Sequence, residues 1–206
     1  MGLPHKRLRT SKFYLMKKNR IGQAKVLTSD QVDQVIKFLP STLHKMIALT
    51  LRNSGARISE VIQLRWQDLD KEELQFPFEI TKKQLDTRQI PIQKDFYNQM
   101  MIWKTEWATL KGREPSGKDY IFPGRFNGSH ITSRSFMYAH EEALERAEIT
   151  KATTHSYRRT QLSQLHKKGV PLRVVQKLSG HRSLDTLQRY LEVSDQDKRD
   201  AIKHLV

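Results

Sequence analysis

The sequence predicts a mainly α-helical fold with one small antiparallel β-sheet, an α+β class. From residue 28 onward, apolar residues recur at steps of three and four, the spacing that places them on one face of a helix. Only between residues 74 and 92 does the pattern change, to two short runs rich in β-type residues. Hydrophobic residues make up 37% of the 206 positions, which suffices for one substantial core.

The first three predicted helices follow one another closely. In LTSDQVDQVIKFLP, Thr28 and Gln31 have the spacing of a capping box, and Pro40 stops the helix. Its apolar stripe consists of Val32, Val35, Ile36 and Leu39. STLHKMIALTLRNSG predicts a second helix that ends at Gly55, a residue suited to a C-cap. SEVIQLRW predicts a third helix, with Ser59 able to cap its start.

The small sheet and the remaining helices follow. LQFPFEI and RQIPI predict two strands joined by the polar stretch TKKQLDT. Helical patterns resume at about 94–110, return at 133–148 and continue to the end of the chain. Pro171 lies at a first helical position in PLRVVQKL, and REPSGKD predicts a loop.

The charge of the chain points to a polyanionic partner. Its 37 Lys and Arg outnumber 22 Asp and Glu, for a formal net charge of +15, and such an excess favours nucleic acid. The first 25 residues carry eight basic residues and no acidic one. This composition predicts that residues 1–26 form a basic arm that contacts nucleic acid, in preference to a tail that is only solvated. The arm residues expected to contact DNA are Lys6, Arg7, Arg9, Lys12, Lys17, Lys18 and Arg20.

Several classes of protein are excluded. The chain has no cysteine, which rules out disulfides, thiolate chemistry and cysteine-based zinc sites. No apolar run approaches the roughly 18 residues of a membrane span, and the N-terminus lacks the apolar stretch of a secretion signal. We therefore expect a cytoplasmic protein with no membrane partner.

Four features carry chemistry-bearing residues in a fixed order. Arg57 follows Gly55 in the turn between two apolar helices. His155 and Arg158 stand at i and i+3, so one helix face presents an imidazole beside a guanidinium, a pair suited to a phosphate. A Gly-His pair follows at His181, and Tyr190 comes nine residues later. Each feature alone is common in basic proteins.

Together, SGARISEV (54–61), HSYR (155–158), SGH (179–181) and Tyr190 resemble the signature boxes of the tyrosine recombinases, or phage integrase family. The resemblance covers residues 27–193 and implies that family's catalytic domain. Three neighbours of the expected catalytic positions depart from the usual pattern. Tyr157 replaces a Leu, Arg159 replaces a His, and Ser179 stands where Leu commonly precedes the Gly-His pair.

The resemblance implies a role for each matched residue. Tyr190 would attack a DNA phosphodiester and form a 3′-phosphotyrosine with release of a 5′-hydroxyl. Arg57 and Arg158 would clamp the non-bridging oxygens, and His155 and His181 would position the phosphate and handle protons. Phosphoryl transfer needs such charge on its equatorial oxygens, which two arginines and a histidine supply without a metal.

The family also uses a lysine of the β-hairpin as general acid. TKKQLDT offers Lys82 and Lys83, and counting back from Pro91 favours Lys83. Glu60 resembles an acidic residue of the family that supports the catalytic side chains without contacting the DNA itself. DNA contacts are further expected from Lys82 and Arg159. The resemblance implies no cofactor, and the sequence has neither an HExxH metal motif nor a GxxxxGK[ST] nucleotide loop.

Only about 26 residues precede the expected catalytic domain, so the chain resembles the short recombinases of fimbrial DNA switches. The initiating Met favours a natural start over a truncated fragment. We expect an arm (1–26), a catalytic domain (27–193) and a helical tail (194–206) whose apolar residues Ala201, Ile202 and Leu205 pack on the chain's own core or on a neighbouring protomer.

The partners implied by the resemblance are double-stranded DNA with specific recombination sites, three further copies in a homotetramer on DNA, and accessory DNA-bending proteins. Free in solution, the chain would be a monomer or weak oligomer. Its source would be bacterial, or a phage or mobile element. Two other functions share these features: a catalytically weak DNA-binding regulator, and a type IB topoisomerase-like enzyme that nicks and closes DNA.

Overall fold

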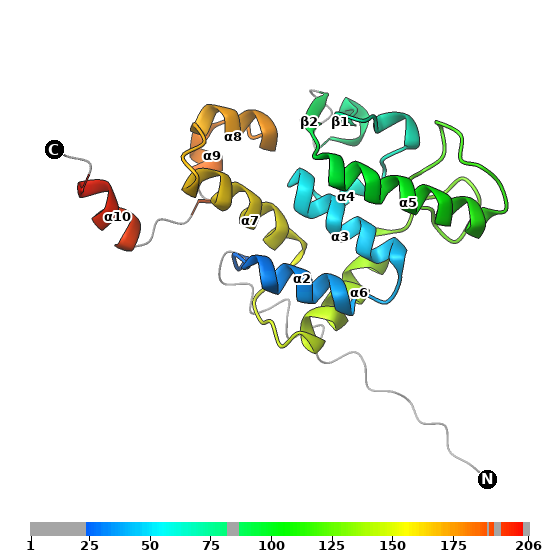
Figure 1. Ribbon diagram of the computed structural model, residues 1–206, viewed down its shortest axis with the longest axis horizontal. Coiled ribbons are helices and arrows are strands. Elements are labelled where there is room, and N and C mark those ends of the chain that lie inside the picture. Colours follow the sequence, from blue (N-terminus) through cyan, green and yellow to red (C-terminus); the bar gives the residue numbers. More distant parts are fainter. Residues whose placement is uncertain (1–23, 82–86, 189, 192–194, 204–206) are drawn as a thin grey trace, which may run out of the picture.

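The protein was analysed as a computed structural model that describes residues 24–81, 87–188, 190–191 and 195–203 (Figure 1). Its elements, in chain order, are α2 (Ser29–Phe38), α3 (Thr42–Ser54), α4 (Ile58–Val61), the 3-10 turn η1 (Trp66–Asp68), β1 (Glu73–Phe76), the 3-10 turn η2 (Phe78–Ile80), β2 (Arg88–Pro91), α5 (Lys94–Lys111), α6 (Ser133–Arg146), α7 (Thr154–Lys167), α8 (Leu172–Ser179), α9 (Leu184–Gln188) and α10 (Asp195–Ile202).

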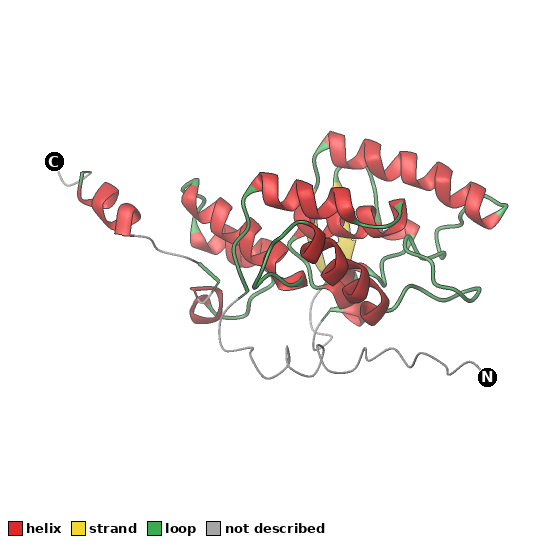
Figure 2. Ribbon diagram, turned by 90° about the horizontal axis from the view of Figure 1, so that it is seen from below, coloured by secondary structure: helices red, strands yellow, loops and turns green. Residues whose placement is uncertain are grey.

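The predicted fold class is confirmed. Helices make up most of the described chain, and β1 and β2 form a two-stranded antiparallel sheet in which Leu74 pairs with Ile90 (Figure 2). Helix α3 lies at the centre, because it packs against α2, α5 and α7 as well as α4 (Figure 1). The C-terminal end of this central helix leads directly into the turn that carries Arg57.

The predicted ends of the first helices are confirmed. Thr28 caps α2 by accepting from the backbone N–H of Gln31, whose side chain accepts in return from the N–H of Thr28. Helix α2 ends at Phe38, ahead of Pro40. Gly55 closes α3 in the left-handed region, with φ of 58°, and its N–H donates to the carbonyl of Leu51.

Three local predictions were wrong. Ser59 does not cap the third helix: Arg57 occupies the N-cap position, and Glu60 caps the helix by accepting from the Arg57 N–H. LQFPFEI is a strand only as far as Phe76, because the chain after Pro77 turns into η2. Pro171 is the N-cap of α8 rather than its first helical residue.

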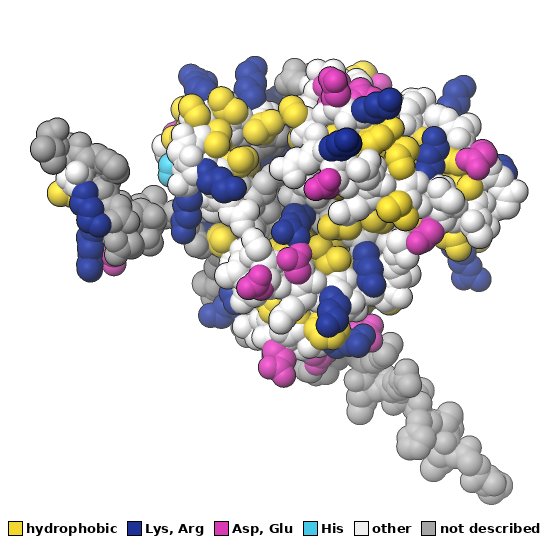
Figure 3. All heavy atoms as spheres, viewed as in Figure 1, with side chains coloured by type: hydrophobic (Ala, Val, Ile, Leu, Met, Phe, Trp, Pro, Cys, Tyr) yellow, Lys and Arg dark blue, Asp and Glu magenta, His cyan; other side chains and the backbone are white. Residues whose placement is uncertain are grey.

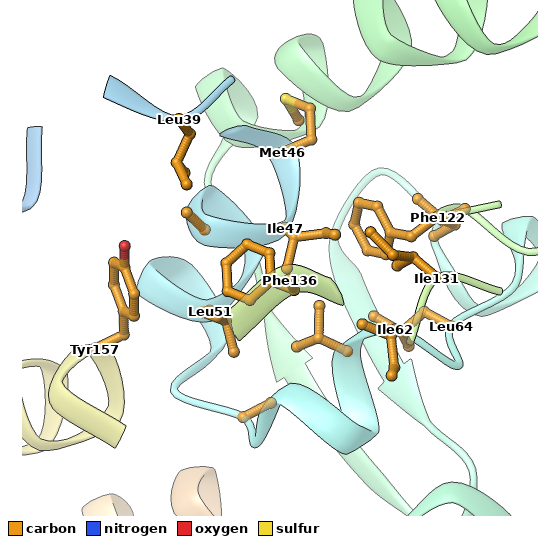
Figure 4. Packing of buried hydrophobic residues seen from close by; sticks show 14 of the residues in the cluster. Leu39, Met46, Ile47, Leu51, Ile62, Leu64, Phe122, Ile131, Phe136 and Tyr157 are labelled. Atoms are coloured by element: carbon orange, nitrogen blue, oxygen red, sulfur yellow. The ribbon is translucent and has the colours of Figure 1, made fainter. Parts of the chain in front are cut away.

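The main core lies between the central helix and its neighbours. Side chains from α3, α6 and α7, among them Ile47, Phe136 and Tyr157, meet there with at most 1% of their surface exposed (Figure 4). Two buried tryptophans of α5 extend this core, and each donates its indole N–H to a backbone carbonyl of the segment at 120–121. This packing fixes α3 and α7 side by side, which matters because both contribute to the site.

A second, smaller cluster forms under the C-terminal helices. Leu162 of α7, Val175 of α8 and Leu187 of α9 are fully buried against one another, and the ring of Tyr190 packs against them. Tyr190 therefore contributes its ring to this packing. The same packing holds the chain after α9 against α7 and α8.

The charged side chains on the face drawn in Figure 3 are dispersed. Lys and Arg are spread over this face with acidic side chains between them, rather than gathered in one patch. Among the described residues, no helix has the length and apolar character needed to cross a membrane. Net charge alone therefore does not locate a binding surface on this face, and the site has to be found from its side chains.

Candidate active site

Arg57 and Glu60 form the first part of the site at the start of α4. The left-handed Gly55 reverses the chain after α3, and Arg57 then takes the extended conformation of an N-cap residue. The Glu60 carboxylate accepts from the backbone N–H of Arg57 at 3.0 Å and from its Nη1 at 2.7 Å. Glu60 is 1% exposed and Arg57 is 23% exposed. The carboxylate thus fixes both the turn and the guanidinium.

Arg158 connects two helix ends through its guanidinium. It is 1% exposed, and its Nη1 donates to the carbonyl of Gly55 at 2.7 Å while its Nη2 donates to the carbonyl of Ser179 at 2.6 Å. Gly55 ends α3 and Ser179 ends α8, so both carbonyls belong to the group that lacks partners within a helix. Arg158 therefore lies where the negative ends of two helix dipoles meet.

His181 lies directly after the end of α8. Gly180 reverses the chain with φ of 66°, and the buried His181 ring follows with its nitrogens 3.3 and 3.4 Å from Nη2 of Arg158. Burial, followed by the positive charges of Arg158, Arg57 and Arg88, lowers the pKa of His181 to about 3, against the opposing charge of Glu60. The ring is therefore neutral at neutral pH.

Tyr190 completes the group from the segment after α9. Its ring centroid is 4.8 Å from that of His181, and Cζ of Arg158 lies 5.7 Å from the centre of the tyrosine ring. Its backbone is held as well, because the Tyr190 carbonyl accepts from Oγ of Ser163 at 3.1 Å. Within one chain, the tyrosine thus lies against the histidine and the arginine that the sequence pattern predicts to act with it.

Arg88 is a site residue that the sequence reasoning missed. Its Nη2 donates to Glu60 at 3.0 Å and its Nη1 to the Ser179 carbonyl at 3.1 Å, so it joins α4 to the end of α8. A Cβ on Gly180 would lie 2.9 Å from Nη1 of Arg88, so the approach also requires a glycine there. The signal was present in RQIPI, where Arg88 shares the inward face of an alternating strand with the buried Ile90.

The site carries an excess of positive charge. Arg57, Arg88 and Arg158 gather around the single carboxylate of Glu60. Burial, followed by the charges of Arg57 and Arg88, lowers the pKa of Arg158 to about 10, which still leaves it protonated at neutral pH. Burial raises the pKa of Glu60, but Arg88 and the N–H and charge of Arg57 outweigh it, so the net shift is downward and the group is ionised. The arrangement suits an anion such as a phosphodiester.

The other predicted residues within the described ranges are His155 and Arg159. His155 is exposed in the first turn of α7, where its N–H donates to Oγ1 of Thr153. Arg159 is 8% exposed, and its Nη1 donates to the carbonyl of Ala24, so it ties the start of the described chain to α7. That contact directs the guanidinium into the protein, and the DNA contact expected for Arg159 stays a prediction.

Lys82 and Lys83 lie outside the described residues, as do the arm residues from Lys6 to Arg20, and their roles stay predictions. Within the described ranges, no three His, Asp or Glu side chains gather in a group that could hold a metal ion. Those ranges contain Arg57, Glu60, His155, Arg158, His181 and Tyr190. Contacts join Arg57, Glu60, Arg158, His181 and Tyr190 into one group, and His155 is exposed at the start of α7.

Comparisons with known proteins agree on the family and the fold. Residues 25–197 match the model of the phage integrase family. A tyrosine recombinase of Pseudothermotoga lettingae is 30% identical over 183 residues, covering 82% of this chain and 60% of that protein. Transposase A from transposon Tn554 of Staphylococcus aureus is 27% identical over 187 residues, covering 86% of this chain and 51% of the transposase.

Among solved structures, the XerH site-specific recombinase bound to a palindromic difH substrate matches with a TM-score of 0.72 and 18% identity, covering 89% of this chain and 54% of that one. This likeness concerns the fold. The chain spans about half to two thirds of the length of the curated relatives that it matches. The resemblance to fimbrial-switch recombinases stays a prediction.

Proposed function

The chain belongs to the phage integrase family, and we propose that it is a site-specific DNA recombinase that cleaves and rejoins DNA through Tyr190. One observation carries the proposal: the ring of Tyr190 lies 4.8 Å from that of His181 and has Cζ of Arg158 over it, within a group of side chains that carries excess positive charge. A tyrosine that only packed would need none of these charged neighbours.

The reaction would follow from this geometry. The Tyr190 oxygen attacks the phosphorus of a DNA phosphodiester, a bond forms between them, and the bond from phosphorus to the 5′-oxygen breaks. Arg57 and Arg158 stabilise the charge that develops on the non-bridging oxygens. The product is a 3′-phosphotyrosine that retains the energy of the broken bond, so a 5′-hydroxyl of another strand can reverse the step without ATP.

The leaving 5′-oxygen needs a proton, which we assign to Lys83, or to its neighbour Lys82, in the hairpin between β1 and β2. His155, at the exposed start of α7, would contact the phosphate from outside the buried group. We assign residues 27–193 to the catalytic domain and residues 1–26 to an arm that contacts DNA through its basic side chains, together with Lys82 and Arg159.

The assembly belongs to the proposal as well. Because Tyr190 lies against His181 and Arg158 of its own chain, cleavage within the protomer is supported. We propose a homotetramer on paired DNA sites, aided by accessory DNA-bending proteins, in the cytoplasm of a bacterium. Helix α10 stands apart from the body in both ribbon views, and Ile202 on it is 66% exposed, which supports docking of residues 194–206 on a neighbouring protomer (Figures 1 and 2).

The test traps the covalent intermediate. The protein is mixed with genomic DNA of its source, the reaction is stopped with detergent, and DNA that remains bound to protein is sequenced to find the site. A nicked duplex carrying that site then accumulates the adduct, because the cleaved strand loses the short piece needed for rejoining. Wild type should form an adduct that Tyr190→Phe cannot form.

Tyr138→Phe is the matched control, since Tyr138 is 46% exposed on α6, where its hydroxyl accepts from Arg134. Adduct from the Tyr190→Phe variant would overturn the assignment of the nucleophile. DNA binding without adduct in any variant would favour a regulator. Relaxation of supercoiled plasmids carrying two sites, without exchange between them, would favour a topoisomerase-like enzyme.

A further inference from the structure

Ser179 is the point at which three elements of the site meet. It is the last residue of α8 and is 1% exposed. Its carbonyl accepts from Nη1 of Arg88 at 3.1 Å and from Nη2 of Arg158 at 2.6 Å. Its hydroxyl oxygen lies 2.7 Å from Nδ1 of His181 and 3.1 Å from the carbonyl oxygen of Gln176. The Ser179 carbonyl thus accepts from the two arginines, and the Ser179 hydroxyl contacts the histidine.

The single proton of the hydroxyl decides which ring nitrogen of His181 carries hydrogen. The Gln176 carbonyl can only accept, so the contact at 3.1 Å requires the Ser179 hydroxyl to donate to it. The hydroxyl then has only lone pairs to offer His181, and the contact at 2.7 Å requires Nδ1 to donate. Both hydrogen bonds form only when the neutral ring carries its proton on Nδ1.

Arg158 does not distinguish the two tautomers. Its Nη2 lies 3.4 Å from Nδ1 and 3.3 Å from Nε2 of His181, so this donor approaches both ring nitrogens about equally. The assignment therefore rests on the Ser179 hydroxyl, which in the other tautomer would have to leave the carbonyl of Gln176 in order to donate to Nδ1.

We propose that Ser179 is a positioning residue whose hydroxyl holds His181 with hydrogen on Nδ1, which leaves Nε2 free of hydrogen and able to accept the proton of Tyr190. The inference rests on the proposed function. As the Tyr190 oxygen bonds to phosphorus, its proton passes to Nε2 and the imidazole becomes an imidazolium. The proton returns to the tyrosine oxygen when a 5′-hydroxyl displaces it, and the leaving 5′-oxygen takes its own proton from the hairpin lysine or from water.

The surroundings make this choice of tautomer consequential. The charged groups that act on His181 are Arg158 of α7, Arg57 at the N-cap of α4, Glu60 of α4 and Arg88 of β2, and the Tyr190 ring lies beside it. Burial, together with the three cations, lowers the pKa of His181 and keeps the ring neutral without DNA, so its chemistry depends on which nitrogen holds the lone pair. A bound phosphodiester adds negative charge at the same place and makes the imidazolium accessible during the reaction.

The test combines the tautomer of His181 with the rate of cleavage. Long-range proton–nitrogen NMR of the folded protein without DNA distinguishes a ring nitrogen that carries hydrogen from one that does not, and His181→Ala identifies the signal. Wild type should give hydrogen on Nδ1. Ser179→Ala removes the hydroxyl but keeps the backbone carbonyl that holds Arg88 and Arg158, and it should shift hydrogen toward Nε2. Ser179→Thr, which restores a hydroxyl, should return it to Nδ1.

On the nicked substrate at saturating protein, Ser179→Ala should form the Tyr190 adduct about 10- to 100-fold more slowly, the usual loss when a partner that orients a histidine is removed. DNA affinity should stay unchanged, because Ser179 is buried. A melting temperature close to that of wild type would exclude a general loss of structure.

Each outcome decides the inference. Hydrogen on Nε2 in wild type, or a tautomer that does not respond to Ser179→Ala, would overturn it. A tautomer that shifts without slowing cleavage would also overturn it, since the position of the hydrogen would then not matter. Cleavage absent from every variant, with the NMR result as expected, would refute the proposed recombinase while leaving the positioning of His181 established.

Discussion

Replacing Glu60 by glutamine tests the electrostatic organisation of the site. Every partner of this carboxylate donates: the N–H and Nη1 of Arg57 at 3.0 and 2.7 Å, and Nη2 of Arg88 at 3.0 Å. Glu60→Gln keeps the shape of the side chain but replaces one acceptor oxygen by an NH₂ group. Whichever way the amide turns, one donor then faces another donor, and two guanidinium groups lose their counter-charge.

The expected loss of stability follows from burial. Removing one member of a buried ion pair typically costs about 3–5 kcal/mol. Arg57 is 23% exposed and remains partly hydrated, so we expect the lower end, about 3 kcal/mol. For a chain of this size, 1 kcal/mol lowers the melting temperature by roughly 2–4 °C, which gives a decrease on the order of 10 °C.

Thermal and urea unfolding measure this loss. Asp33→Asn is the control, because Asp33 pairs with Arg52 across α2 and α3 at the surface, where both side chains are more than a third exposed. Such an exposed pair contributes at most about 1 kcal/mol. A Glu60→Gln variant that lost no more stability than Asp33→Asn would refute the view that this carboxylate holds the two arginines.

The pH dependence gives an independent check. Burial raises the pKa of Glu60, but Arg88 and the N–H and charge of Arg57 outweigh it and place the net pKa below its ordinary value of 4.5. The stabilisation from ionised Glu60 is therefore fully present above pH 4.5 and is lost as pH falls through the lower, folded-state value. The difference in stability between wild type and Glu60→Gln should accordingly shrink as the pH falls below 4.5 and through the lower pKa of the folded state.

Three further substitutions test the surroundings of the site. Gly55→Ala should lower the free energy of unfolding in urea by about 1 kcal/mol more than Gly112→Ala does. Both glycines end helices at positive φ, so the backbone cost is shared. A Cβ at Gly55 would lie 1.9 Å from Oε1 of Gln161, whereas none of the described atoms lies within 4 Å of a Cβ at Gly112. Equal costs would contradict the steric argument. Arg88→Lys, which keeps the charge but not the two-armed contact, should slow adduct formation about 10-fold with little change in DNA affinity, whereas an unchanged rate would remove Arg88 from the site. Tyr157→Phe should leave stability unchanged or raise it by up to about 1 kcal/mol, since its buried hydroxyl has no hydrogen-bond partner among the described residues; a loss of 2 kcal/mol or more in the same assay would show that the hydroxyl is bonded.

The sequence predicted those parts of the fold that local chemistry decides. The fold class, the capping box at Thr28 and the left-handed end of α3 at Gly55 each depend on residues within one turn of each other. The predicted start of the third helix was wrong. Helix α4 begins at Ile58, so Ser59 lies inside it, and the carboxylate of Glu60 accepts from the N–H of the N-cap residue Arg57.

The site was predicted only in part, because it is held together by contacts between distant residues. Arg57, Arg158, His181 and Tyr190 were identified by their resemblance to family motifs, and composition alone would have left them ordinary. Arg88 is 28 residues from Glu60 and 91 residues from Ser179 in the sequence, so no local pattern links them. The alternation in RQIPI indicated that Arg88 lies on the inward face of a strand. The sequence did not indicate that Glu60 would be the partner that compensates the buried charge of Arg88.

The choice of partners explains how this site remains positive while Arg88 and Arg158 are buried. A buried guanidinium needs acceptors, and a carboxylate at every position would satisfy the arginines but cancel the charge that a phosphodiester requires. Here the carbonyls of Gly55 and Ser179, at the ends of α3 and α8, accept from Arg158 and Arg88 without neutralising them. The helix dipoles make these carbonyls better acceptors than isolated ones. Glu60 is thus needed to orient Arg57 and Arg88, and a second carboxylate in the same place would stabilise the free protein at the expense of phosphate binding.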